Sequence, residues 1–124
     1  MRSRKWFAAV VGGLTVAACA QIILTGCHHV LTPQQAEGEH LYDTRCAHCH
    51  EDNDLGLKKV PPNLHGVFNR DELPSGAPAT DAEVEKVVLA GRGLMPSFAG
   101  RFGNEQIAAL IAYIHTGMRD AKTE

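Results

Sequence analysis

The sequence predicts an all-α fold of three to four short helices in a single domain. Two helix-start signatures are present, at Thr32-Pro33-Gln34-Gln35 and at Thr80-Asp81-Ala82-Glu83. Each places a threonine at the N-cap and a Gln or Glu three residues later. Towards the C-terminus, apolar residues recur at a helical spacing of three and four; they are Ile107, Leu110, Ile111 and Ile114. The 124 residues leave room for one domain.

The first predicted helix begins after Thr32 and runs to about Arg45. Pro33 suits the first helical position, because the N–H that proline lacks would have no intrahelical partner there. Gly38 and Tyr42 are four residues apart, so they lie on one face of this helix. The helix leads directly into a short cysteine motif.

This motif is Cys46-Ala47-His48-Cys49-His50, which reads C-x-x-C-H and is the pattern of covalent c-type haem attachment. Residues three apart on one helical turn share a face, so both thiols can reach the two vinyl groups of one porphyrin. His50 is then close enough to the ring centre to be the proximal iron ligand. The motif therefore predicts one haem c, bound through Cys46 and Cys49.

Two other uses of a Cys-x-x-Cys pair fit the sequence less well. A structural zinc site needs four ligands, usually in two pairs, but no second cysteine pair follows and the downstream His65 and His115 are isolated. A thioredoxin-like redox pair expects a strand before the motif, whereas a helical pattern precedes it here.

The segment from Glu51 to Ala79 is predicted to be mostly loop, because prolines and glycines interrupt it throughout. A loop of this length is unusual in a compact domain unless it packs on a buried haem. Six apolar residues are expected to do so: Leu55, Leu57, Val60, Leu64, Val67 and Phe68. A second helix is expected to follow Thr80 and to end at Gly91. Its apolar residues at helical spacing are Val84, Val87 and Val88.

Met95 is the candidate for the second iron ligand. It lies in Gly93-Leu94-Met95-Pro96-Ser97-Phe98, and Pro96 favours an extended conformation for the residue before it. A lone methionine is more often part of a core, but its place on a rigid loop 45 residues after His50 favours the ligand. The last helix is expected to begin at Gly103 or Asn104 and to run to about Thr116.

The N-terminus has the layout of an export signal. Arg2, Arg4 and Lys5 precede an apolar run from Trp6 to Leu24. An uncleaved membrane helix is one alternative, since this run nears the ~20 residues that span a bilayer.

The end of the run is more specific, because Leu24-Thr25-Gly26-Cys27 resembles a bacterial lipobox. We therefore expect residues 1–26 to be a lipoprotein signal peptide and Cys27 to be lipidated. Val16-Ala17-Ala18-Cys19 is a second candidate that fits less well. With Cys27 lipidated and Cys19 removed, the two motif cysteines carry haem and none remains for a disulfide.

Loss of the signal changes the net charge. The whole sequence has twelve basic and fourteen acidic residues, and residues 1–26 hold three basic and no acidic ones. Nine against fourteen remain, a net charge of −5. Binding to DNA is disfavoured, because phosphate contacts require a basic face. A partner with a basic docking patch is favoured.

Together these residues resemble class I cytochrome c, over roughly Pro33 to Gly117. Gly38-x-x-x-Tyr42-x-x-x-Cys46 is similar to the family's first helix, in which the glycine lets the last helix cross closely. Leu110-Ile111-Ala112-Tyr113-Ile114 is similar to that last helix. The resemblance implies a class I cytochrome c fold, with three to four short helices wrapped around one covalently bound haem.

The resemblance also implies further haem contacts. Pro62-Asn63-Leu64-His65-Gly66 resembles the segment whose proline carbonyl accepts the proton of the proximal imidazole, so Pro62 is expected to bond to His50. Arg70 would contact a haem propionate. Met95-Pro96-x-Phe98 resembles the distal ligand loop of bacterial members. The tryptophan that holds a propionate in mitochondrial members has no counterpart, since Trp6 is the only tryptophan.

The function that follows is one-electron transfer by a monomeric, non-enzymatic protein with His50 and Met95 as axial ligands. Its expected partners are redox proteins such as a quinol-oxidising complex, a terminal oxidase or a dehydrogenase. The expected organisation is a signal peptide at 1–26, a lipid-anchored tether at 27–32 and a haem domain at 33–124, held on the extracytoplasmic or periplasmic side of a bacterial membrane.

Two alternatives stay open at this point. One is a haem subunit fixed in a membrane dehydrogenase or oxidase complex, with the lipid serving assembly. The other is a peroxidase-type enzyme with an open sixth site, which the presence of Met95 disfavours.

Overall fold

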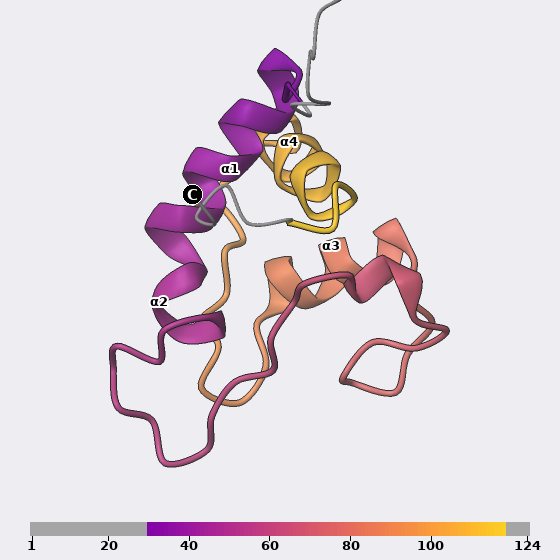
Figure 1. Ribbon diagram of the computed structural model, residues 1–124. Coiled ribbons are helices and arrows are strands. Elements are labelled where there is room, and N and C mark those ends of the chain that lie inside the picture. Colours follow the sequence, from indigo (N-terminus) through magenta and orange to yellow (C-terminus); the bar gives the residue numbers. More distant parts are fainter. Residues whose placement is uncertain (1–29, 119–124) are drawn as a thin grey trace, which may run out of the picture. The chain divides into compact units, whose positions relative to one another are not determined.

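The computed structural model describes residues 30–118. Its helices are α1 (Pro33–Arg45), α2 (Ala47–His50), α3 (Asp81–Ala90) and α4 (Asn104–Ile114), with a short 3-10 helix, η1 (Val67–Asn69) (Figure 1). Within these residues the only β pairing is two isolated bridges, so the predicted all-α class is confirmed. No helix in this described part is long and apolar enough to cross a membrane.

Several predictions for the N-terminus fall outside the described residues. These are the signal peptide at 1–26, the lipidated Cys27, the alternative Cys19 and residues 27–29 of the tether. Residues 119–124, at the end of the predicted haem domain, also lie outside. Of the described residues, 31–118 belong to one compact unit.

The predicted start of α1 is confirmed by its capping hydrogen bonds. The Gln35 N–H donates to Thr32 Oγ1 at 3.2 Å, and the Thr32 N–H donates to Gln35 Oε1 at 2.9 Å. This reciprocal pair satisfies two N–H groups that the helix cannot bond internally. The helix ends at Arg45, as predicted, and Cys46 follows with its N–H donating to the Tyr42 carbonyl at 2.8 Å.

Helices α1 and α4 pack closely where Gly38 meets the middle of α4. A Cβ at Gly38 would overlap the Ala109 carbonyl and lie 2.8 Å from Cβ of Tyr113. The rings of Tyr42 and Tyr113 meet nearby, with centroids 5.7 Å apart. The close crossing predicted at Gly38 is therefore present, and it buries Tyr42 beside α4.

Helix α3 begins with half of its predicted capping box. Thr80 Oγ1 accepts from the Glu83 N–H at 3.4 Å, but the Glu83 carboxylate pairs with Lys86 at 3.3 Å instead of turning back to the cap. The helix ends at Ala90, and Gly91 follows with a φ of 72°. Its ψ of 173° lies outside the αL region of the usual glycine cap, so the helix ends at the predicted glycine, which takes a different positive-φ conformation that only glycine adopts readily.

Helix α4 ends at Ile114, slightly earlier than predicted. The Thr116 N–H donates to the Tyr113 carbonyl at 2.9 Å, and the Gly117 N–H donates to the Ile114 carbonyl at 3.0 Å. Bonds of this i to i+3 type tighten the chain into a turn. That turn brings Met118 into the core, where only 2% of it is exposed.

Candidate haem site

The cysteine motif forms the short helix α2 and the residue before it. The Cys49 and His50 N–H groups both donate to the Cys46 carbonyl, at 3.1 and 2.9 Å. This single turn brings the two cysteines and the histidine together, as their spacing predicts. Both thiols are free and partly buried.

The Cys46 thiol is not suited to disulfide exchange in the haem-free chain. Burial, and then the neighbouring Cys49, raise its pKa to about 12. Because the thiolate is the reactive form in exchange, a thiol that stays protonated at neutral pH is inert. This argues against the thioredoxin-like alternative. The zinc alternative also lacks support, since no three His, Cys, Asp or Glu side chains within residues 30–118 are grouped to hold a metal ion.

Next to the motif is a cavity of about 630 Å³, within the range of protein sites for cofactors and small ligands. Five of the predicted site residues line it: Cys46, Cys49, His50, Pro62 and Met95. The remaining lining is mostly apolar and comes from α1, η1, α3, α4 and the loops. It includes Leu57, Leu64, Val67, Leu73, Val84, Val87, Val88, Phe98, Leu110 and Ile114. An apolar cavity bordered by two thiols, an imidazole and a thioether fits a covalently bound haem.

His50 is oriented by the backbone of the following loop. Its Nδ1 lies 2.7 Å from the Pro62 carbonyl oxygen, so the hydrogen bond expected from the resemblance is present. A carbonyl can only accept, so Nδ1 carries the proton and donates it. The lone pair of the imidazole is then on Nε2, which leaves that nitrogen free to ligate a metal.

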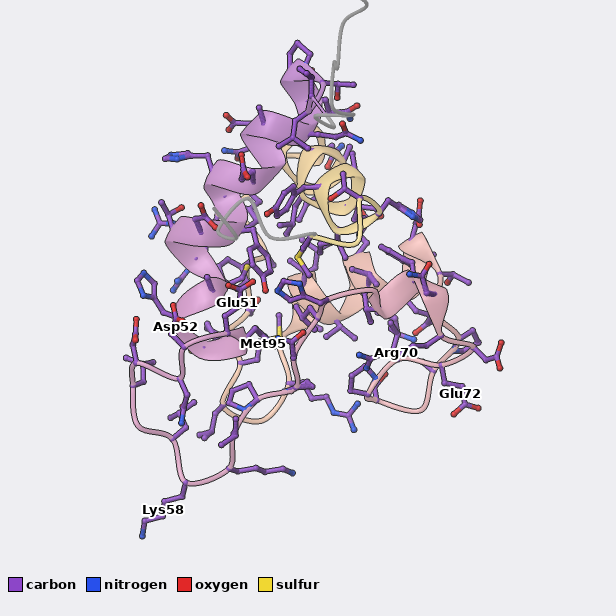
Figure 2. The ribbon with its side chains drawn as sticks, viewed as in Figure 1. Glu51, Asp52, Lys58, Arg70, Glu72 and Met95 are labelled. Carbon is purple, nitrogen blue, oxygen red and sulfur yellow. The ribbon has the colours of Figure 1, made fainter. Side chains whose placement is uncertain are left out.

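Met95 is held on a loop that is bonded to itself and to α3. The Met95 and Arg92 backbones exchange two hydrogen bonds of 3.0 Å, which form an isolated β-bridge. Ser97 Oγ donates to the Leu89 carbonyl at 2.6 Å, and the Phe98 N–H donates to the Val88 carbonyl at 3.1 Å. In Figure 2 the Met95 side chain lies among the surrounding elements, whereas Lys58 and Glu72 extend outward.

Gly91 allows this loop to approach α3 closely. A Cβ at Gly91 would lie 2.6 Å from the Met95 carbonyl oxygen and 2.8 Å from the Ser97 nitrogen. The glycine at the end of α3 therefore has two tasks: it adopts a backbone conformation with φ 72° and ψ 173° that favours glycine, and it leaves space for the methionine loop.

Arg70 is the predicted site residue that does not line the cavity. Its guanidinium Nη2 donates to the His65 carbonyl at 3.4 Å, and in Figure 2 it lies away from Met95. Three other cations line the cavity instead: Arg45, Lys59 and Arg92, all exposed. No Asp or Glu is among the described residues of this lining. For two of these cations the sequence held a signal of their place at the site that was missed: Arg45 directly precedes Cys46, and Arg92 is three residues before Met95.

Of the six loop residues that were expected to pack on haem, four line the cavity. Leu57, Val60, Leu64 and Val67 line the cavity, whereas Leu55 and Phe68 do not. Leu55 is 67% exposed. The Phe68 ring stacks on His115 with centroids 3.8 Å apart, so this side chain covers the end of α4.

Comparisons with known proteins agree with this site. The family model described as "Cytochrome C oxidase, cbb3-type, subunit III" matches residues 33–114. A cytochrome c6 from Microcystis aeruginosa is 31% identical over 78 residues, which are 63% of this chain and 90% of the relative. A cytochrome c from Kluyveromyces lactis is 46% identical over 56 residues, 44% of this chain and 51% of the relative.

The extent of these matches differs. The chain spans about half the length of the Kluyveromyces protein, and 32% of a cytochrome c from Nigella damascena that is 46% identical over 35 residues. It spans nearly all of the cytochrome c6. No solved structure gave a significant match.

Proposed function

Since this chain belongs to the class I monohaem cytochromes c, in the family that includes the cbb3-type oxidase subunit III domain, we propose that it carries single electrons between redox proteins with His50 and Met95 as axial ligands. It is an electron-transfer protein rather than an enzyme, and its cofactor is haem c bound through cysteines. The observation that supports the ligand assignment is that Cys46, Cys49, His50 and Met95 all line one apolar cavity. Bound haem supplies an iron that gains and loses one electron, and a thioether ligand favours its reduced form.

The residues around His50 suit a group that must stay in place during turnover. The Pro62 carbonyl accepts the Nδ1 proton at 2.7 Å, which restricts the ring and leaves Nε2 as the nitrogen that would ligate the iron. A hydrogen bond of this kind also raises the basicity of the ligand nitrogen.

The residues around Met95 restrict its movement in the same way. The two hydrogen bonds with Arg92, together with the Ser97 and Phe98 bonds to the end of α3, hold the loop on both sides of the methionine. Because neither ligand has to bind or leave, the protein reorganises little when an electron arrives. An open sixth site, as in a peroxidase, would require the Met95 side chain to move out of the cavity while this loop is held by its hydrogen bonds.

We further propose that redox partners dock over the mouth of the cavity. Val60 and Leu94 line it and are 66% and 73% exposed, and the cations there are Arg45, Lys59 and Arg92. A partner interacts with the charges at the docking face itself, so this basic face suits a partner with an acidic surface. The net charge of −5 predicted for the mature chain favoured a partner with a basic patch instead. The two indications differ because a net charge also counts surfaces that do not take part in docking.

The site of action proposed for the chain is the outer side of a bacterial membrane. The support is the sequence layout alone: a basic n-region, an apolar run and the lipobox ending in Cys27. Labelled palmitate should enter the wild type and not Cys27→Ser. Labelling of both proteins, or a mature chain that retains Trp6, would contradict the lipid anchor.

A fixed haem subunit of an oxidase complex is the second candidate, because the matching family is described as an oxidase subunit. The two candidates differ in what stays bound in detergent. A carrier should be recovered alone from solubilised membranes, whereas a subunit should be recovered with its complex at constant stoichiometry.

The ligand assignment is tested by Met95→Ala in the haem-loaded protein. Wild type should bind carbon monoxide poorly when reduced and should show the near-infrared charge-transfer band of an iron–thioether bond when oxidised. Met95→Ala should lose the band and bind carbon monoxide readily. Met118→Leu is the matched control: it removes the other thioether of the described chain, which is buried in the core and does not line the cavity. Ready binding by wild type, with no change in Met95→Ala, would refute the proposal.

A further inference from the structure

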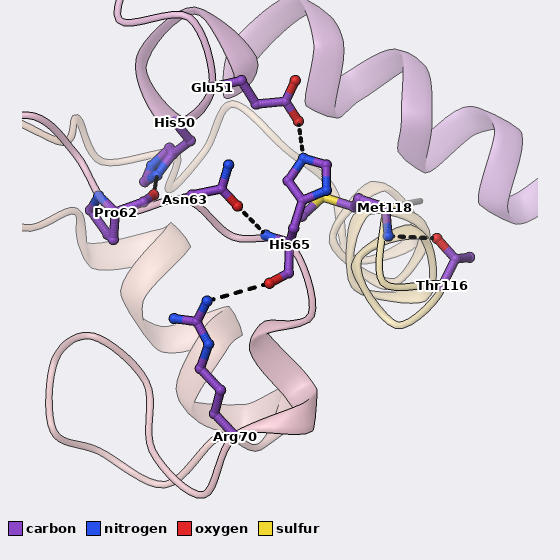
Figure 3. A network of polar contacts seen from close by, with 8 residues as sticks. All are labelled: His50, Glu51, Pro62, Asn63, His65, Arg70, Thr116 and Met118. Atoms are coloured by element: carbon purple, nitrogen blue, oxygen red, sulfur yellow. Dashed lines mark hydrogen bonds and ion pairs between the residues drawn. The ribbon is translucent and has the colours of Figure 1, made fainter. Parts of the chain in front are cut away.

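Glu51, the residue directly after His50, makes a side-chain hydrogen bond with a residue of the proline loop. Its Oε1 lies 2.8 Å from Nε2 of His65 (Figure 3). The two side chains are only 24% and 30% exposed. Fourteen residues separate them, so this contact joins α2 to a distant part of the loop.

His65 is held at three separate atoms. Its N–H donates to Asn63 Oδ1 at 2.8 Å, and its carbonyl accepts from Arg70 Nη2 at 3.4 Å. The imidazole Nε2 makes the contact with Glu51. These bonds fix the histidine relative to Pro62, three residues before it, so a force on its ring is transmitted to the Pro62 segment (Figure 3).

The same two segments are joined by a second link, the hydrogen bond from His50 Nδ1 to the Pro62 carbonyl. One hydrogen bond alone lets the two segments rotate about the line that joins its atoms. Two links, through neighbouring residues 50 and 51 on one side and 62 and 65 on the other, remove that rotation. The length and angle of the His50–Pro62 bond then depend on the Glu51–His65 pair.

We propose that Glu51 and His65 act as positioning residues that hold the Pro62 carbonyl against His50 and thereby set the reduction potential of the bound haem. The proposal rests on the ligation by His50 described above. Loss of the pair loosens the hydrogen bond, lowers the basicity of the imidazole, and so raises the potential.

A second histidine–carboxylate contact of the motif provides a matched control. His48 Nδ1 lies 2.9 Å from Asp54 Oδ2, with side chains 59% and 52% exposed. It involves the same motif and the same chemical groups. However, it closes only a local turn, in which the Asp54 N–H also donates to the His48 carbonyl, and it makes no link to the proline loop.

The test uses the haem-loaded protein and the variants Glu51→Gln, His65→Gln, their double variant, His48→Gln and Asp54→Asn. Two quantities are measured: the solvent exchange rate of the His50 ring proton, by NMR of the reduced form, and the reduction potential. Glu51→Gln and His65→Gln should each accelerate exchange by about fivefold or more, as expected when a charged hydrogen bond is lost. Each should raise the potential. The exchange rate of the double variant should match that of each single variant, because both substitutions break one link. The control variants should leave the exchange rate unchanged.

His65→Gln decides between positioning and simple charge effects. Removing the Glu51 carboxylate also raises the potential by Coulomb interaction, but removing a histidine cannot raise it in that way. An unchanged or lowered potential in His65→Gln, or additive effects of the two substitutions on the exchange rate in the double variant, would overturn the proposal. If the His50 ring resonances of the reduced wild type are not shifted by the porphyrin ring current, that would instead refute the ligation by His50, which is a separate result.

Discussion

A methyl group added at Gly38 tests the crossing of α1 and α4 on which the fold depends. The Cβ of Gly38→Ala would overlap the Ala109 carbonyl and lie 2.8 Å from Cβ of Tyr113. The first of these neighbours is backbone within a helix, so it cannot turn aside as a flexible side chain would. The two helices would have to separate.

The magnitude follows from two opposed effects. Overpacking of a close contact costs about 1–3 kcal/mol, and overlap with a backbone atom places this site near the upper limit. Alanine in a helix is favoured over glycine by about 1 kcal/mol. We therefore expect a net loss of about 2 kcal/mol in the free energy of unfolding, out of the ~5–15 kcal/mol typical of a domain. The larger Gly38→Val should lose more.

Thermal and urea unfolding of the haem-loaded protein measure this loss. A net loss of that size corresponds to a fall in Tm of roughly 8–16 °C for a domain of this length. Ala36→Gly, on an exposed position of the same helix, calibrates the propensity term and should cost about 1 kcal/mol. If Gly38→Ala is instead more stable than wild type, the propensity gain is unopposed and the close crossing at Gly38 is wrong.

Three further predictions follow from other contacts. Burial, and then the Glu51 carboxylate, raise the pKa of Tyr42 above its ordinary value of 10.0, so the phenol stays protonated in the folded chain at a pH where it ionises in the unfolded chain. The stability that this group contributes is therefore complete below about pH 10 and falls above it. Urea titrations at pH 8 and 11 should show a smaller alkaline loss of stability for Tyr42→Phe than for wild type. Gly91→Ala should weaken the near-infrared band, because its Cβ would lie 2.6 Å from the Met95 carbonyl oxygen. Gly93→Ala is the control: the φ at Gly93 is also positive, but a Cβ there would have no neighbouring atom within 4 Å, so this variant should keep the band. Mass spectrometry should find one haem added to the chain, with the pigment resisting acid–acetone extraction, and loss of the colour on extraction would contradict the covalent attachment.

Several parts of the site could be predicted because their signals are local. The Thr32–Gln35 capping bonds, the single turn that carries the cysteine motif and the end of α3 at Gly91 each depend on residues within a few positions of one another. Side-chain spacing and backbone hydrogen bonding determine such features wherever the segment lies in the fold. The Gly38 crossing was predictable for another reason, since it came from the resemblance to a family.

The sequence by itself thus determined the helices, the covalent haem motif and the identity of the two candidate ligands. Tertiary structure alone decided which side chains of the loop from 51 to 79 face the cavity: Leu57 and Leu64 line it, while Phe68 covers α4. It also decided that Arg92 lines the cavity while Arg70 bonds to the His65 carbonyl. The physical reason is that this segment has no helical or strand period to assign its faces, so contacts between residues far apart in the chain, such as Glu51 and His65, place each side chain.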